Sequence, residues 1–338
     1  MIDLRSDTVT KPTPKMLEAM MSAPVGDDVF NEDPSINKLQ EKAAQLFGME
    51  DALFCPSGTM TNQIAISAHV GALEEIIVEK ESHIYQYEGG GIFHNSRASV
   101  KLVDGINGKL NAKQVLSAIS PDDIHKAVTR LVSLENTTNR GGGDTYTLQE
   151  LRDIRKVVDE NGLLLHLDGA RVFNALIEES YEAIDLGKIF DSISICLSKG
   201  LGCPVGSLLL GSKDFIKKSR RIRKVLGGGM RQAGFLAQAG SYALDNHIER
   251  LREDHKLAKD LESILLNFSF IERVVPVKTN IVIFHLREDL DPSIFLEYLK
   301  SNGILAVHFG EQAIRFVTHL DIREEFLEEI RRVLSKFS

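Results

Sequence analysis

The sequence predicts an α/β protein, in which a large domain has a mostly parallel sheet covered by helices and a smaller α+β domain follows. Two observations carry this prediction. Short apolar runs alternate with amphipathic segments through most of the 338 residues, which is typical of strands buried between two helical layers. In the last quarter the order of elements changes, which indicates a second, smaller core.

Two helix starts can be recognised from their capping residues. Asp33 and Pro34 have the types preferred at an N-cap and at the first helical position, and Gly48 follows the apolar stripe as a stop signal. Thr147, with Glu150 three residues later, forms a capping box that opens a helix reaching residue 161.

Strands are expected where short apolar runs stand between turn signals. A Ser57-Gly58-Thr59 turn joins the first strand to a helix over residues 59–70. In chain order, the strands expected for the large sheet cover residues 52–55, 75–78, 100–103, 131–134, 163–167, 192–197 and 207–210.

The domain boundary is expected near residues 245–275. Residues 230–267 have an almost wholly helical pattern, and a different order begins after Pro276. There we expect strands over 280–286 and 314–317, and helices over 292–301 and 323–337. We therefore assign residues 1–250, including an N-terminal arm, to the large domain and residues 251–338 to the small one.

Charge and composition exclude several classes of protein. The net charge of -8 gives no reason to expect a nucleic-acid or anionic-membrane partner. The first residues carry acids where a signal peptide would be apolar, and no apolar run approaches the ~18 residues needed to span a bilayer. Cys55, Cys196 and Cys203 lack CxxC spacing, so we expect a reducing, cytoplasmic location and no metal site.

The most informative residues are Asp168 and Lys199. Asp168 ends an apolar strand, and Lys199 stands in a Ser-Lys-Gly turn after the next one. Ligands of α/β proteins bind at the carboxyl ends of strands, so the two side chains are expected to face one site. An aspartate that pairs with a pyridinium nitrogen and a lysine that attaches an aldehyde are what pyridoxal 5'-phosphate requires. The alternative is a capping aspartate and a solvated surface lysine.

Other residues fit the same site but are weaker alone. Gly58 and Thr59 begin a helix whose N–H groups can hold one phosphate, although many turns look the same. Arg171 suits a substrate carboxylate or an ordinary ion pair. His83 can stack on a flat ring or move protons, with Tyr87 and His125 as further substrate-side candidates; His125 could equally be a helix-end histidine. Arg231, after three glycines, can supply an anion contact across a subunit interface.

Taken together, these motifs resemble those of the low-specificity L-threonine aldolases over nearly the whole chain, up to residues 314–319. Four positions depart from the pattern of that family, namely Thr61, Thr138, Cys203 and the turn at residues 307–310. The matching stretches are DLRSDTVT (3–10), VGDDV (25–29), SGTM (57–60), ESHI (81–84), ENT (135–137), HLDGAR (166–171), CLSKGL (196–201) and LGGGMRQ (226–232).

The resemblance implies the aspartate-aminotransferase-like fold type of pyridoxal 5'-phosphate enzymes and a homo-oligomer, as a dimer of dimers, with sites at dimer interfaces. It implies that Lys199 attaches the cofactor, Asp168 pairs with the ring nitrogen and His83 stacks on the ring. Phosphate binding is implied for Gly58, Thr59 and a neighbouring subunit's Arg231, and carboxylate binding for Ser6, Arg171 and Arg315. Lys224 would be a basic residue of the active site. His125 and Tyr87 would lie near the substrate hydroxyl.

The expected activity is cleavage of L-threonine or L-allo-threonine, a small-molecule amino-acid substrate, to glycine and acetaldehyde. His83 is the first choice for the base that removes the β-hydroxyl proton, and His125 is the second. Two alternatives remain open: another lyase or aminotransferase reaction on the same cofactor, and a non-catalytic protein that binds a phosphate ligand.

Overall fold

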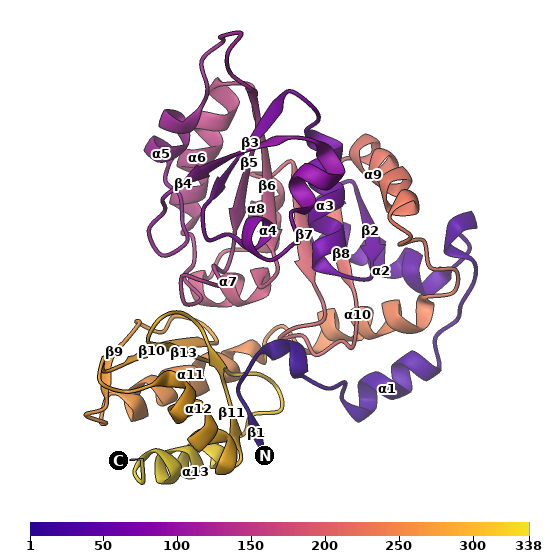
Figure 1. Cartoon of the computed structure of the whole chain (residues 1–338). Coiled ribbons are helices and arrows are strands. Elements are labelled where there is room, and N and C mark those ends of the chain that lie inside the picture. The colour runs from indigo at the N-terminus through magenta and orange to yellow at the C-terminus, as the bar shows by residue number, and fades with distance from the viewer. Residues whose placement is uncertain (338) are drawn as a thin grey trace.

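The large domain is built on a seven-stranded sheet, as the computed structural model of residues 1–337 shows (Figure 1). β8 is antiparallel to both of its neighbours and the other pairs are parallel, which confirms the mostly parallel sheet. In spatial order the strands are β2 (Asp51–Cys55), β8 (Ser207–Gly211), β7 (Ser192–Cys196), β6 (Leu164–Gly169), β5 (Val128–Glu135), β3 (Glu74–Glu79) and β4 (Ser99–Val103).

The helices of the large domain begin where the capping residues predict. The Asp33 carboxylate accepts from the N–H groups of Ser35 and Ile36, and Thr147 and Glu150 form both bonds of the capping box. The helices are α1 (Pro14–Met21), α2 (Pro34–Phe47), α3 (Gly58–His69), α4 (His83–Gln86), α5 (Ala112–Ala118), α6 (Leu148–Glu160), α7 (Val172–Glu179), α8 (Ala183–Gly187), α9 (Lys213–Val225) and α10 (Gly234–Asn246), with single turns at Asp7–Val9, Asp28–Phe30 and Ile92–Ser96.

Both faces of the large sheet are buried. Leu208 and Leu210 of β8 lie in the main core with residues of α2, α6 and α10, whereas Leu209 packs with residues of α3 and α9. Successive side chains of a strand point to opposite faces, so helices must cover the sheet on both sides. This explains why the strands read as continuous apolar runs rather than as an alternating pattern.

The small domain carries a four-stranded antiparallel sheet in the order β12 (Val307–His308), β13 (Ala313–Val317), β10 (Ile281–Leu286) and β9 (Ile271–Val274). It also contains α11 (Leu251–Leu265), α12 (Pro292–Ser301), β11 (Ile304–Leu305) and α13 (Glu325–Leu334). The helical pattern over 230–267 corresponds to α10 and α11, separated by a break at residues 247–250. No helix within residues 1–337 is long and apolar enough to cross a membrane.

The first residues of the N-terminal arm pack with the small domain. β1 (Ile2–Asp3) pairs in parallel with β11, beside it in Figure 1, and Ile2 and Leu4 lie in the small core. α11 connects the two cores, since Leu251 packs in the large one and Leu257 in the small one. A division of the chain at residue 250 therefore stays a prediction.

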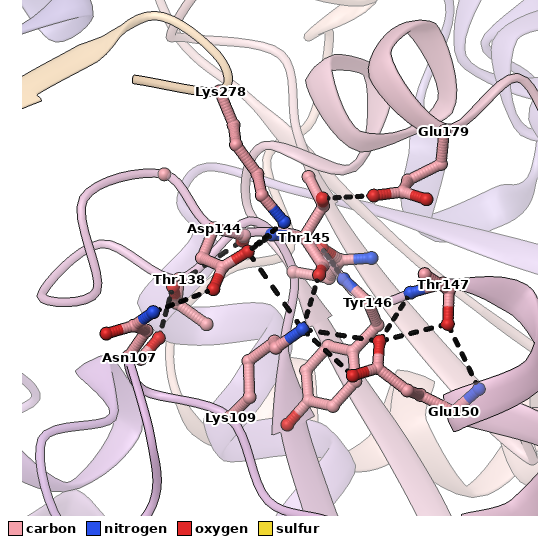
Figure 2. Close-up of polar contacts among 12 residues, drawn as sticks. Asn107, Lys109, Thr138, Asp144, Thr145, Tyr146, Thr147, Glu150, Glu179 and Lys278 are labelled. Carbon is pink, nitrogen blue, oxygen red and sulfur yellow. Dashed lines mark hydrogen bonds and ion pairs between the residues drawn. The ribbon is translucent and has the colours of Figure 1, made fainter. Parts of the chain in front are cut away.

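A polar cluster attaches the small domain to the large one next to the end of β5 (Figure 2). Asp144 lies in the loop after β5 and pairs with Lys278, which precedes β10, at 2.6 Å. The Thr279 hydroxyl also donates to the carbonyl of Gly143 at 2.9 Å. The contacts with Lys278 and Thr279 hold β10, and with it the neighbouring β13, at the carboxyl edge of the large sheet.

Candidate active site

A cavity of ≈ 550 Å³ opens at the carboxyl ends of β5 and β6 and is closed on one side by the small domain. It brings together residues that are far apart in the sequence and that the sequence analysis singled out. The predicted residues among those that line it are Ser6, His83, Tyr87, Arg171, Lys199 and Arg315. Asp168 is the next-to-last residue of β6, at the strand end where it was expected, and it is not among the residues that line the cavity.

Asp168 is held rigidly at the floor of this region. The residue is 2% exposed, one carboxylate oxygen accepts from the N–H of Ala170 at 3.1 Å, and the other accepts from the Asn62 amide at 3.0 Å. A buried carboxylate with only two hydrogen bonds can still accept a third from a cationic ring nitrogen. Lys199 follows β7 in the neighbouring turn and is half-buried.

His83 begins α4 and is paired with a buried acid that the sequence analysis missed. Its Nδ1 lies 3.2 Å from Oε1 of Glu88, whose side chain is fully buried and also accepts from the amides of Asn62 and Gln63. Burial disfavours the charged imidazolium, but the hydrogen bond with Glu88 and the carboxylate of Asp168 outweigh it and raise the pKa of His83. In sequence, an acid five residues after a histidine gave no signal of this contact.

The same three side chains are the only group within residues 1–337 whose atoms are spaced to hold a metal ion. Ligand atoms of His83, Glu88 and Asp168 lie within 4.8 Å of one another. His83 and Asp168 are also two of the side chains expected around a cofactor ring, so the arrangement does not require a metal.

The start of α3 fits a phosphate group. A side chain at Gly58 would place its Cβ 2.5 Å from Sγ of Cys196, so only glycine lets the backbone lie there. The first N–H groups of the helix have no partner within it and point toward an anion. Thr59 lines a cavity of ≈ 320 Å³ at this position. The Ser207 hydroxyl, near Gly58, is buried and makes no hydrogen bond to the described residues. Together these groups fit the phosphate of pyridoxal 5'-phosphate.

The two predicted carboxylate-binding arginines differ in their partners. Arg171 forms a bidentate pair with the buried carboxylate of Asp7, with distances of 2.8 and 2.7 Å. Arg315 instead donates to Oδ1 of Asn139 at 2.9 Å and to the carbonyl of Arg5 at 3.0 Å, and its Nε is buried with no partner among the described residues. Arg315 is therefore the cation that retains capacity for a substrate carboxylate.

Besides Asp168, Gly58 and Thr59, three predicted residues do not line the cavity within one chain. Arg231 is exposed and pairs with Asp27 at 2.9 Å, and Lys224 is exposed near the end of α9. His125 is 80% exposed in the loop before β5, at the opposite end of the sheet, and pairs with Asp123. A role for any of them in this cavity needs a second chain. Thr138 also lies outside it, donating to the carbonyl of Asn107.

The comparison with known proteins identifies the family of the chain. A family model described as beta-eliminating lyase matches residues 3–289. The chain is 45% identical to the low specificity L-threonine aldolase of Escherichia coli O157:H7 over 331 residues, which cover 98% of this chain and 97% of that protein. The chain belongs to the low-specificity L-threonine aldolase family.

More distant members of the threonine aldolases agree in sequence and in structure. The low specificity L-threonine aldolase of Saccharomyces cerevisiae is 39% identical, over 99% of this chain and 86% of that protein. The structure of a Leishmania major threonine aldolase aligns with a TM-score of 0.85 at 26% identity and covers 99% of both chains. A putative L-allo-threonine aldolase from Listeria monocytogenes has the same fold, with a TM-score of 0.81 at 22% identity, covering 99% and 96% of the two chains. The α/β fold expected from the resemblance is thereby confirmed.

Proposed function

We propose that this chain binds pyridoxal 5'-phosphate in the cavity and cleaves L-threonine and L-allo-threonine to glycine and acetaldehyde. Membership of the low-specificity L-threonine aldolase family makes the chain a lyase. The observation that carries the proposal is that His83, Lys199 and Arg315 line one cavity, with Asp168 close to His83 at the end of β6.

The residues that would hold the cofactor follow from their positions. Lys199 would attach its aldehyde carbon, Asp168 would accept from its ring nitrogen, and His83 would lie against its ring. Gly58 and Thr59 would bind the phosphate through the start of α3. When bound, the cofactor supplies an electron-withdrawing ring that stabilises negative charge at the substrate α-carbon.

The protein orients the substrate through its carboxylate. Arg315 and Ser6 both line the cavity, and the hydrogen bonds of Arg315 within residues 1–337 go to uncharged oxygens only. Arg171 has committed two of its donor atoms to Asp7, so it contributes only its remaining N–H groups. Holding the carboxylate would fix rotation about the N–Cα bond and so keep the Cα–Cβ bond perpendicular to the cofactor ring, which selects that bond for cleavage.

We assign His83 as the base that takes the proton from the β-hydroxyl. It lines the cavity, is about one third exposed, and is oriented by its contact with Glu88. A general base of this kind contributes about 10²- to 10⁴-fold, so we expect His83→Ala to retain the cofactor and lose that factor in kcat. His125 stays the second candidate, and only a neighbouring chain could bring it to this cavity.

The contact between His83 and Glu88 predicts a pH dependence. His83 acts as a base only when neutral, so its raised pKa places the acid limb of kcat/KM above the usual 6.5 of histidine. Glu88→Gln removes the negative partner, so the limb should move to lower pH. Glu74→Gln, at the opposite end of β3, is the matched control and should leave the limb in place. An unchanged limb in Glu88→Gln would show that His83 is not the group that titrates.

Product identity tests the activity itself. Purified holoenzyme would be offered L-threonine, L-allo-threonine and D-threonine, with acetaldehyde measured by a coupled dehydrogenase. We expect acetaldehyde and glycine from the L isomers only. A keto acid or ammonia would instead indicate transamination or β-elimination, and the absence of a visible cofactor band would indicate a non-catalytic phosphate-binding protein.

We also propose a homo-oligomer, a dimer of dimers located in the cytoplasm. Arg231 and Lys224 are exposed beside two apolar side chains, Val225 at 86% and Phe30 at 68% exposure, which suits a surface that another chain covers. The three cysteines are buried and unpaired, as expected in a reducing compartment. Light scattering with size-exclusion chromatography tests the assembly, and a monomeric active enzyme would overturn it.

A further inference from the structure

Among the described residues Arg315 has no ion-pair partner, unlike Arg171 and Arg140 at the same cavity. Within residues 1–337 its two hydrogen bonds go to uncharged oxygens, those of Asn139 and of the Arg5 carbonyl. Burial and the positive charge of Arg171 lower the pKa of Arg315 to about 10. Its orientation therefore depends on contacts other than a carboxylate.

Phe309 supplies such a contact. It lies in the hairpin between β12 and β13, at residues 307–310 where the sequence departs from the family pattern. Val307 is paired with Arg315 across this hairpin, and the N–H of Phe309 bonds to the carbonyl of Ala313 at 2.8 Å. This register puts Phe309 and Arg315 on the same face, and the Arg315 guanidinium carbon is 4.6 Å from the ring centroid.

Arg140 fixes the hairpin from the large domain. It follows β5, and its Nη1 donates to the Phe309 carbonyl at 2.7 Å while its guanidinium carbon lies 4.5 Å from the Phe309 ring centroid. Its Nε is in turn held by Glu81 at 3.3 Å. Arg140 and Phe309 also form the wall that separates the active-site cavity from a neighbouring cavity of ≈ 620 Å³. The small-domain hairpin is thus fastened directly over the site.

We propose that Phe309, held by Arg140, is a positioning residue for Arg315 and sets the affinity of the site for the substrate carboxylate. The inference rests on the proposed carboxylate-binding role of Arg315. Without the ring, the guanidinium gains rotational freedom and must be ordered each time a carboxylate binds, which costs affinity. The chemical step at the far side of the substrate is not directly affected.

Two small amines separate this role from a general structural one. Glycine and glycinamide both carry the reacting amine, but only glycine has a carboxylate. Binding of each to the holoenzyme is followed by the change in its visible absorption. In Phe309→Leu we expect the glycine dissociation constant to rise about tenfold, a factor in the range of one cation–π contact, with glycinamide almost unchanged. Arg140→Gln should act in the same direction with the ring retained, and Phe309→Tyr should restore wild-type binding.

Controls make each outcome decisive. Phe268→Leu removes a ring from the aromatic cluster of the small domain, away from the site, and should change neither ligand. In an Arg315→Ala background, Phe309→Leu should have no further effect on glycine. The positioning role would be overturned if Phe309→Leu weakened the binding of glycine and of glycinamide equally. It would also be overturned if Phe309→Leu weakened glycine binding as much in the Arg315→Ala background as in the wild type. Unchanged glycine binding in Arg315→Ala alone would instead remove the proposed carboxylate site, and the inference with it.

Discussion

Lys199→Ala is expected to abolish cleavage of L-threonine, with turnover reduced by more than about 10⁴-fold. Lys199 is the residue that would attach the cofactor and exchange it for the substrate amine, and no other lysine of residues 1–337 lines the cavity. Asp168 and the start of α3 remain, so the variant should still bind the cofactor non-covalently. Acetaldehyde release and the visible spectrum measure the two effects separately.

Borohydride reduction identifies the attachment site independently of activity. In the wild type it should fix the cofactor irreversibly to the peptide that contains Lys199, as detected by mass spectrometry. Lys199→Ala should show no such adduct, whereas Lys188→Ala, at an exposed lysine outside the cavity, should behave as wild type. An adduct at any other lysine, or turnover retained by Lys199→Ala, would contradict the assignment.

The helices and strands were predictable because short stretches of sequence indicate each of them. Strands buried on both faces read as apolar runs, and Asp33 and Thr147 mark helix starts by residue type. That Asp168 and Lys199 lie at the same edge of the sheet was also predictable, since β6 and β7 are parallel neighbours and their carboxyl ends lie together. The start of the chain was harder, because β1 pairs with β11 about 300 residues away and no local pattern records that partner.

The sequence could not assign partners to charged side chains. Nothing in the sequence shows that Glu88 is fully buried against His83, since residue type alone does not distinguish a buried glutamate from an exposed one. Arg171 was open to two interpretations, a carboxylate ligand or an ion pair, and Asp7, with which it forms an ion pair, is 164 residues away. Phe309 was visible only as a departure from the family pattern. Its contact with Arg140 depends on how the two domains meet.

The ion pair of Asp7 and Arg171 leads to the second large prediction, which concerns stability. Neither side chain has appreciable exposure, at 0% and 6%, and Asp7 also accepts from the Asn280 amide at 3.2 Å. Arg171→Ala would leave the Asp7 carboxylate buried and unpaired, so we expect a loss of about 3–5 kcal/mol in the free energy of unfolding. Denaturant unfolding of the holoenzyme measures it. Asp7→Asn with Arg171→Gln should recover part of the loss, since no unpaired charge remains.

The pH dependence of this stability has a definite sign. Burial alone would raise the pKa of Asp7, but the charge of Arg171 and its hydrogen bonds outweigh burial and lower the pKa from 3.8 to about 2. The pair therefore stabilises the fold fully above pH 3.8, and its contribution is lost as the pH falls toward 2. In Arg171→Ala this contribution is absent, so the difference in stability from wild type should shrink over the same interval of falling pH.

Arg315→Ala is the control that separates stability from substrate binding. Arg315→Ala removes a guanidinium from the same cavity. Because Arg315 has no acidic partner within residues 1–337, this substitution leaves no buried carboxylate unpaired. We expect it to raise KM for L-threonine while unfolding at a denaturant concentration close to that of wild type. If Arg171→Ala instead raises KM with unchanged stability, Arg171 is mainly a substrate ligand. Asp7 then orients that ligand and does not hold the N-terminal arm to the large domain.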